Sequence, residues 1–144
     1  MRGRPLVADT GGLLRALARD PDGKASWPEY EATLRSASRV IVPALILAEV
    51  DYFLRDQRRA MSQLIAELFD PDTTYEFEPL EPTDVARAME LDVKFENLGL
   101  GLVDGVVAAV AERRRVHRVL TIDRDDLGPL RIGDRFNVRL ELVP

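Results

Sequence analysis

The segment LGLGLVDGVVAAVAER, residues 98–113, joins a glycine-rich start to an apolar helix that carries one aspartate, Asp104. Apolar residues recur at the spacing of a buried helical face, at Val103, Val106, Val107, Val110 and Ala111. None of the residues one turn from Asp104 can pair with a carboxylate, for they are Leu100, Gly101, Val107 and Ala108. A buried charge without a partner is costly, and the helix dipole offsets only part of that cost. We therefore expect a cation from outside the helix at Asp104.

The composition is that of an ordinary globular domain. The chain has 144 residues, 46% of them hydrophobic and 31% charged, which predicts one domain with a sizeable core. With no cysteine and one histidine, disulfides, thiol nucleophiles, zinc sites rich in Cys or His and two-histidine RNA cleavage are excluded. The net charge of −5 has the wrong sign for a generic DNA coat. Asp9 and Arg15 interrupt the region after the basic start, so we expect no signal peptide, no membrane span and a cytoplasmic location.

Short apolar runs alternate with helical patterns along the chain. Strands are predicted at 5–8, 40–42, 75–79, 118–122 and, at the sheet edge, 136–140. Helices are predicted around Leu13 to Leu17, over 27–38 and 44–54, through Leu64, Ile65, Leu68 and Phe69, and over 83–95 and 102–115. Strands that alternate with helices favour an α/β domain with a parallel sheet covered on both faces.

Two aspartates lie at equivalent places in that pattern. Asp9 follows the first strand and Asp123 follows the strand that ends at Ile122. In open parallel sheets the ligand crevice lies beyond the C-terminal strand ends, so both carboxylates would reach it. A turn or cap role is the usual one for a single such aspartate; two at matching strand ends favour a common site.

Glu49 adds a fourth lone carboxylate to Asp9, Asp104 and Asp123. It lies on the apolar stripe of the helix after Pro43 and has no partner at helical spacing; a half-exposed position at the edge of that stripe is the alternative. Four carboxylates brought together would repel one another. An all-oxygen cluster of this kind suits Mg²⁺ or Mn²⁺, ions that commonly serve phosphoryl chemistry.

Four motifs in this order resemble those of PIN domains, and more narrowly those of VapC-type toxin ribonucleases from bacterial toxin–antitoxin pairs. They are VADT at 7–10, VPALILAEVDY at 42–52, LGLVD at 100–104 and LTIDRDD at 120–126. The resemblance implies one domain over 1–144, an α/β three-layer sandwich. Its central parallel sheet would have four to five strands in the order 3-2-1-4-5, with helices on both faces.

The resemblance also implies the site and its partners. Asp9, Glu49, Asp104 and Asp123 would be the catalytic residues and ligands of Mg²⁺ or Mn²⁺. Thr10, Thr121 and Asp126 are secondary candidates, although turn formation is favoured for Asp126 and its neighbour Asp125. Family members cleave RNA by metal-activated water, which leaves 5′-phosphate and 3′-hydroxyl ends, and are silenced by an antitoxin protein.

The chain departs from the family pattern at three glycines. Gly11 and Gly12 stand where Ser or Ala often follows Asp-Thr, and Gly105 stands where Ala is more usual. A glycine inside a helix costs about 1 kcal/mol relative to alanine, so we expect another group to approach the backbone closely there.

Two other functions that use clustered carboxylates do not fit the same residues, and a third stays open. A receiver-type phosphoacceptor needs a lysine near the phosphoryl group, whereas the only lysines, Lys24 and Lys94, are predicted in a loop and on a helix. A dehalogenase-like phosphatase needs an aspartate where Gly11 stands. A catalytically inactive PIN-like module that binds RNA or protein remains the alternative to a nuclease.

Three further features concern partners. The stretch 43–69 has more apolar residues than two short helices need for packing on a sheet, so we expect another chain to cover part of it. The resemblance implies two such covers, a second copy of this protein and an antitoxin helix in an apolar groove. It also implies that an antitoxin arginine reaches the carboxylates and competes with the metal. Arg113, Arg114 and Arg115 are interpreted as solvated charge complementing a helix dipole rather than as RNA contacts, and Trp27 as a packing residue rather than a base-stacking platform.

Overall fold

The computed structural model describes residues 3–144 of the chain. Met1 and Arg2, which belong to the basic start considered for a signal peptide, lie outside the described residues. The strands are β1 (Leu6–Ala8), β2 (Val40–Pro43), β3 (Tyr75–Glu78), β4 (Arg118–Leu120), β5 (Arg131–Ile132), β6 (Val138–Arg139) and β7 (Glu141–Val143). The helices are α1 (Thr10–Leu17), α2 (Pro28–Ser36), α3 (Ile46–Phe53), α4 (Arg58–Leu68), α5 (Pro82–Lys94), the 3₁₀ turn η1 (Glu96–Leu98), α6 (Gly101–Arg114) and α7 (Arg124–Leu127).

A five-stranded parallel sheet forms the centre of the molecule. Its order is β3-β2-β1-β4-β7, and Val7 of β1 is in register with Ile41 of β2 and Val119 of β4. Strands β1 and β2 are buried along their whole length, as expected for a parallel sheet covered on both faces. The predicted α/β three-layer fold is confirmed, and so is the strand order, with β7 as the fifth strand of the sheet.

The predicted edge strand at 136–140 is wrong. Val138 and Arg139 form β6, which pairs with β5 in a separate antiparallel hairpin. The hairpin turns through two residues with positive φ, Gly133 at 91° and Phe136 at 52°. The edge of the central sheet is β7 instead, which pairs in parallel with β4. The alternating pattern of 136–140 suits either kind of strand, so it could not identify the pairing partner.

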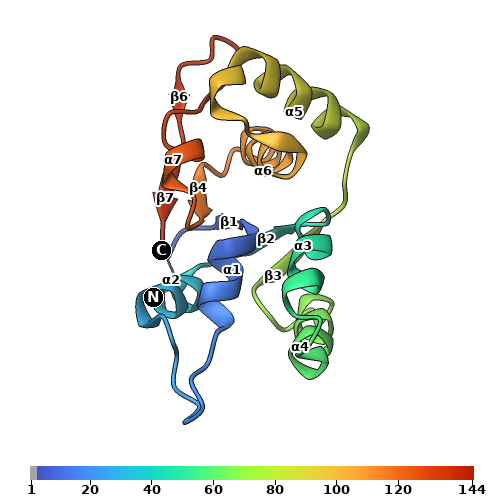
Figure 1. Cartoon of the computed structure of the whole chain (residues 1–144), viewed down its shortest axis with the longest axis vertical. Coiled ribbons are helices and arrows are strands. Elements are labelled where there is room, and N and C mark those ends of the chain that lie inside the picture. The colour runs from blue at the N-terminus through green and yellow to red at the C-terminus, as the bar shows by residue number, and fades with distance from the viewer. Residues whose placement is uncertain (1–2) are drawn as a thin grey trace.

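The helices cover both faces of the sheet (Figure 1). Helix α6 packs over β1 and β2 with α5 outside it, while α1 and α2 lie on the opposite side and α4 lies against β3. Helix α6 begins at Gly101, which has a φ of 74°, two residues after Gly99, which has a φ of 58°. Its segment from Gly105 to Ala111 is buried without a break. Within residues 3–144 no helix combines the length and hydrophobicity needed to cross a membrane.

Close backbone approach explains two of the three unusual glycines. A Cβ on Gly12 would lie 2.2 Å from the carbonyl oxygen of Leu120, so α1 rests directly on the end of β4. A Cβ on Gly105 would lie 2.8 Å from the Cβ of Ala88, where α6 crosses α5. The close approach predicted for these glycines is confirmed. It brings α1 and α6, two helices that carry site residues, tight against their neighbours.

The interpretation of Arg113 and Arg114 as solvated charge is wrong. Arg113 donates two hydrogen bonds to the buried carboxylate of Asp84, at 2.9 and 3.0 Å. Arg114 donates to Glu76 at 2.8 Å and also to Glu78. These ion pairs join the end of α6 to β3 and to the start of α5. Arg115 is exposed and ends the helix with a φ of 55°.

Candidate metal centre

Two candidate carboxylates lie at the C-terminal ends of neighbouring strands. Asp9 follows β1, is 5% exposed and caps α1, where the Thr10 backbone N–H donates to its Oδ1 atom at 2.8 Å. Asp123 follows β4 and caps α7, where the Asp126 backbone N–H donates to its Oδ1 atom at 3.1 Å. Both aspartates therefore have the cap role that their turn chemistry favours, and both also face the edge of the sheet.

Two threonine hydroxyls fix the orientation of the carboxylates. The fully buried Thr121 hydroxyl donates to Asp9 Oδ2 at 2.8 Å and accepts from the Asp123 backbone N–H at 3.0 Å. The Thr10 hydroxyl donates to Glu49 Oε1 on α3 at 2.6 Å. Each hydroxyl thus joins two chain segments that are far apart in sequence. Glu49 is half-buried, as the edge-of-stripe alternative required, yet it points toward α1 rather than into solvent.

Three aspartates, Asp104, Asp123 and Asp126, form a tight cluster. Carboxylate oxygens of Asp104, Asp123 and Asp126 all lie within 4.8 Å of one another. Helix α7 brings this about, because it holds Asp126 three residues after Asp123 on the same side of one helical turn. Asp125 is exposed and is not part of the cluster. The backbone of Asp126 takes part in the turn, as expected, because its N–H donates to Asp123. Its side chain, however, lies in the cluster with Asp104.

The surroundings of Asp104, Asp9 and Asp126 raise the pKa of these three carboxyls. Burial raises the pKa of Asp104 to about 7, and the charges of Asp9, Asp123, Asp126 and Glu49 add to the shift. The pKa of Asp9 is raised by burial, with hydrogen bonds from Thr121 and Thr10 opposing the shift. That of Asp126 is raised by desolvation and by Asp123. All five carboxylates therefore share one electrostatic site.

The donor set fits a hard divalent cation. Carboxylate oxygens are the ligands that Mg²⁺ and Mn²⁺ prefer, and the Asp104–Asp123–Asp126 cluster presents three of them to one point. Within residues 3–144 no arginine or lysine forms an ion pair with Asp9, Glu49, Asp104, Asp123 or Asp126. A cation from outside the protein would relieve the repulsion that this arrangement creates.

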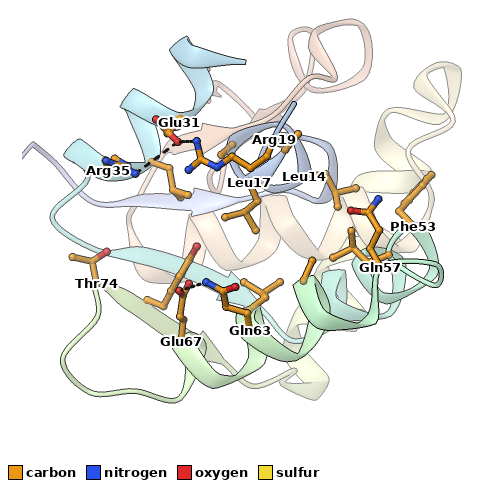
Figure 2. A pocket seen from close by; sticks show the side chains of 17 residues that line it. Leu14, Leu17, Arg19, Glu31, Arg35, Phe53, Gln57, Gln63, Glu67 and Thr74 are labelled. Atoms are coloured by element: carbon orange, nitrogen blue, oxygen red, sulfur yellow. Dashed lines mark hydrogen bonds and ion pairs between the residues drawn. The ribbon is translucent and has the colours of Figure 1, made fainter. Parts of the chain in front are cut away.

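An open groove begins one helical turn from the carboxylates. It has a volume of about 820 Å³ and lies between α1 and α4, with α2 and α3 at its ends. Leu14 follows Thr10 by one turn of α1, and Phe53 follows Glu49 by one turn of α3; both line the groove. Figure 2 shows these two residues above Gln57 and Gln63, with Arg19 paired to Glu31 at the far end.

Trp27 lies outside the core, contrary to the packing role inferred from the sequence. It is the residue before α2, is 44% exposed and stands edge-on to Tyr30 with ring centroids 6.3 Å apart. The guanidinium of Arg15 lies 3.9 Å from the centre of its ring.

Comparison with known proteins gives consistent results. A family model described as "PIN domain" matches residues 6–128. Ribonuclease VapC26 of Mycobacterium tuberculosis is 26% identical over 136 residues, which cover 92% of this chain and 98% of that protein. The crystal structure of Mycobacterium tuberculosis VapC20, described as a sarcin-ricin loop cleaving toxin, superposes with a TM-score of 0.67 at 18% identity. That match covers 82% of this chain and 89% of the VapC20 chain, and it supports the fold.

Proposed function

This chain belongs to the PIN-domain family, and from that premise we propose that it is a metal-dependent endoribonuclease toxin held in check by an antitoxin protein. The observation that carries the proposal is the meeting of five carboxylates from α1, α3, α6 and α7 at one edge of the sheet. Similarity to ribonuclease VapC26 supports RNA as the substrate class. Which RNA is cut would depend on the loops and arginines around the site.

The proposed reaction is hydrolysis of one phosphodiester bond. A water oxygen bonds to phosphorus, the bond between phosphorus and the 3′ oxygen breaks, and the leaving oxygen takes up a proton. The products carry a 5′-phosphate and a 3′-hydroxyl, and no cyclic phosphate forms because the 2′-hydroxyl is not the nucleophile. When bound, Mg²⁺ or Mn²⁺ supplies a more acidic water and neutralises charge on the phosphate.

Each carboxylate of the site has a proposed role. Asp9, Glu49, Asp104 and Asp123 would hold the cation, joined by Asp126, because the oxygens of Asp104, Asp123 and Asp126 already converge. Asp9 accepts one hydrogen bond on each oxygen, from Thr10 and Thr121, and Glu49 accepts one from Thr10, so both carboxylates are held in fixed positions from which they would bind the cation. Pre-oriented ligands of this kind lower the reorganisation needed when a metal and substrate arrive.

Cleavage of labelled single-stranded RNA tests this function. We expect cleavage with Mg²⁺ or Mn²⁺, none in EDTA, and none by the Asp104→Asn variant. Asp51→Asn is the matched control, because Asp51 is half-exposed, pairs with Arg58 and lies outside the carboxylate cluster. A folded wild-type protein that binds RNA but never cleaves it with either cation would favour the inactive binding module instead.

The groove between α1 and α4 is the place we propose for an antitoxin segment. Its walls carry Leu14, Leu17, Phe53 and Leu64, which suit the apolar face of a helix. A segment that occupies the groove ends one helical turn from Thr10 and Glu49. An arginine placed there would pair with the unpartnered carboxylates and compete with the metal.

Exposed aromatic side chains support a second contact, with another copy of this chain. Tyr52 and Phe69, which do not line the groove, are 61% and 60% exposed. We expect light scattering to give a dimer mass, and the product of the adjacent gene to co-purify and suppress cleavage. We place the protein in the cytoplasm, where it would encounter both RNA and the antitoxin. A monomer without such a partner would contradict the toxin assignment but leave the nuclease in place.

A further inference from the structure

Helix α1 carries a cation, Arg15, that has no acidic partner among the described residues. Within residues 3–144 Arg15 forms no ion pair, although the chain has 25 acidic residues against 20 basic ones. Its guanidinium lies 3.9 Å from the centre of the Trp27 ring and 5.4 Å from that of Tyr30. It also donates to the Tyr30 hydroxyl at 3.5 Å. Aromatic faces therefore orient this cation while its charge stays uncompensated.

Hydrogen bonds connect this group to the proposed metal centre. The Tyr30 hydroxyl donates to the Thr121 carbonyl oxygen at 3.4 Å, and the hydroxyl of the same Thr121 holds Asp9. Two contacts thus separate the aromatic pair from a proposed metal ligand.

Helix α1 provides a second link along its surface. Gly11 and Arg15 are four residues apart, so they lie on the same face of the helix. The exposed side chain of Ile122 covers Gly11, where a Cβ would lie 2.6 Å from it. Ile122 directly precedes Asp123. The exposed Ile122 therefore lies between Asp123 and the face of α1 that carries the half-buried Arg15, and the guanidinium of Arg15 lies against the exposed Trp27.

We propose that Arg15, Trp27, Tyr30 and Ile122 form a binding strip for the single-stranded RNA that flanks the scissile phosphate. Arg15 pairs with a backbone phosphate, and bases stack on Trp27 and lie against Ile122. The strip combines a flat aromatic surface with one unpaired cation, which is the combination that binds single strands with little sequence preference. This inference rests on the proposed ribonuclease function.

The chemistry favours RNA over a peptide at this strip. The antitoxin groove lies on the other side of α1, where Leu14 and Leu17 face α4 (Figure 2). The strip itself has an indole, a phenol and a guanidinium, and a nucleotide matches both the stacking surface and the charge.

Trp27 is the only tryptophan of the chain, so its fluorescence reports on the strip alone. We expect short unstructured oligouridylate and oligoadenylate to quench it saturably in the Asp104→Asn protein, which would leave the RNA intact. Quenching should weaken with salt. Absence of quenching under conditions where RNA binding is measured independently would overturn the inference, as would equal quenching by an oligoglutamate peptide, which cannot stack.

Steady-state cleavage by the otherwise native protein gives a second readout. Arg15→Gln should raise KM roughly fivefold and Trp27→Ala roughly tenfold, with kcat within about twofold of wild type. Trp27→Phe should restore much of the lost affinity. Arg139→Gln is the control, since Arg139 is exposed on β6, away from α1 and α2 (Figure 1).

The outcomes separate this inference from the proposed function. Cleavage by the wild type with an unchanged KM in Arg15→Gln and Trp27→Ala would overturn the strip and leave the nuclease standing. Quenching of Trp27 by RNA, together with a wild type that never cleaves, would support the strip and contradict the nuclease. A Trp27→Ala protein that fails to fold leaves Arg15→Gln and the fluorescence titration to decide.

Discussion

At the scale of single residues, Asp104 is a carboxylate whose surroundings disfavour the charged form. Burial and four neighbouring carboxylates raise its pKa from 3.8 to about 7. Without a cation, the folded protein therefore keeps a proton on Asp104 at pH values where the unfolded chain has released it. The apolar sequence around Asp104 already indicated this conflict, because no neighbour at helical spacing can neutralise the carboxylate.

The sign of the resulting pH dependence can be worked out. Between about pH 4 and pH 7 the folded state binds more protons at Asp104 than the unfolded state, so the free energy of unfolding falls as pH rises. Asp104→Asn should remove a fall on the order of 2 kcal/mol, after allowance for partial exposure. Urea unfolding in EDTA at both ends of this window measures it. The same pH dependence in variant and wild type would place Asp104 outside the cluster.

The role of Thr121 could not be predicted with the same clarity. The sequence supports Thr121 only as a secondary candidate, because sequence spacing does not tell which groups its hydroxyl meets. It also gives too little weight to the side chain of Asp126, for a related reason. A turn and a short helix give an Asp-x-x-Asp pair the same sequence signal, but only the helix turns both carboxylates to one side.

Thr121→Val should weaken metal binding by about 10- to 100-fold, because Asp9 loses the hydrogen bond that orients it. It should also cost roughly 1–3 kcal/mol of stability, since the Asp123 backbone N–H loses its acceptor. Calorimetric titration with Mn²⁺ measures the affinity. Thr33→Val is the control, because the Thr33 hydroxyl bonds only within α2. Unchanged affinity in Thr121→Val would assign Thr121 a structural role alone.

At the scale of elements, local pattern predicted the helices and inner strands, and failed where partners are distant in sequence. The strands β1, β2 and β4 are short apolar runs whose burial leaves little choice of role. Residues 136–140 alternate as an edge strand does, and the positive φ of Phe136 that folds them into a hairpin has no sequence signal. The arginines that end α6 likewise find partners about 30 residues away, which helical spacing cannot show.

Replacement of Arg113 tests whether the ion pairs at the end of α6 stabilise the fold. Without Arg113, the carboxylate of Asp84, which is 2% exposed, would lose its ion-pair partner. The carboxylate of Glu78, which is 9% exposed, would keep only Arg114. Removing one partner of a buried ion pair is strongly destabilising, so Arg113→Ala should lower the free energy of unfolding by roughly 3 kcal/mol. Arg115→Ala is the control, because Arg115 is exposed and forms no ion pair within residues 3–144. Equal stability of the two variants would show that the network contributes little.

At the scale of the whole molecule, the fold gathers charges that the sequence keeps apart. Asp9, Glu49, Asp104 and Asp123 come from four elements, and parallel strands with close helix contacts at Gly12 and Gly105 bring those elements to one edge. The edge is then bordered by two distinct surfaces on α1. One is the apolar groove proposed for an antitoxin, and the other is the strip of Arg15 and Trp27 proposed for RNA.

Thermal unfolding during a Mn²⁺ titration tests most directly whether these carboxylates form a metal centre. Binding to the folded state should raise the melting temperature with the logarithm of concentration above the dissociation constant, and should add about 2.7 kcal/mol at 100 times that constant. The variant with Asp9→Asn, Glu49→Gln, Asp104→Asn and Asp123→Asn should show no such rise, while Asp22→Asn should behave as the wild type. A quadruple variant that responds to Mn²⁺ as the wild type does would contradict the account, because the cation would then bind elsewhere.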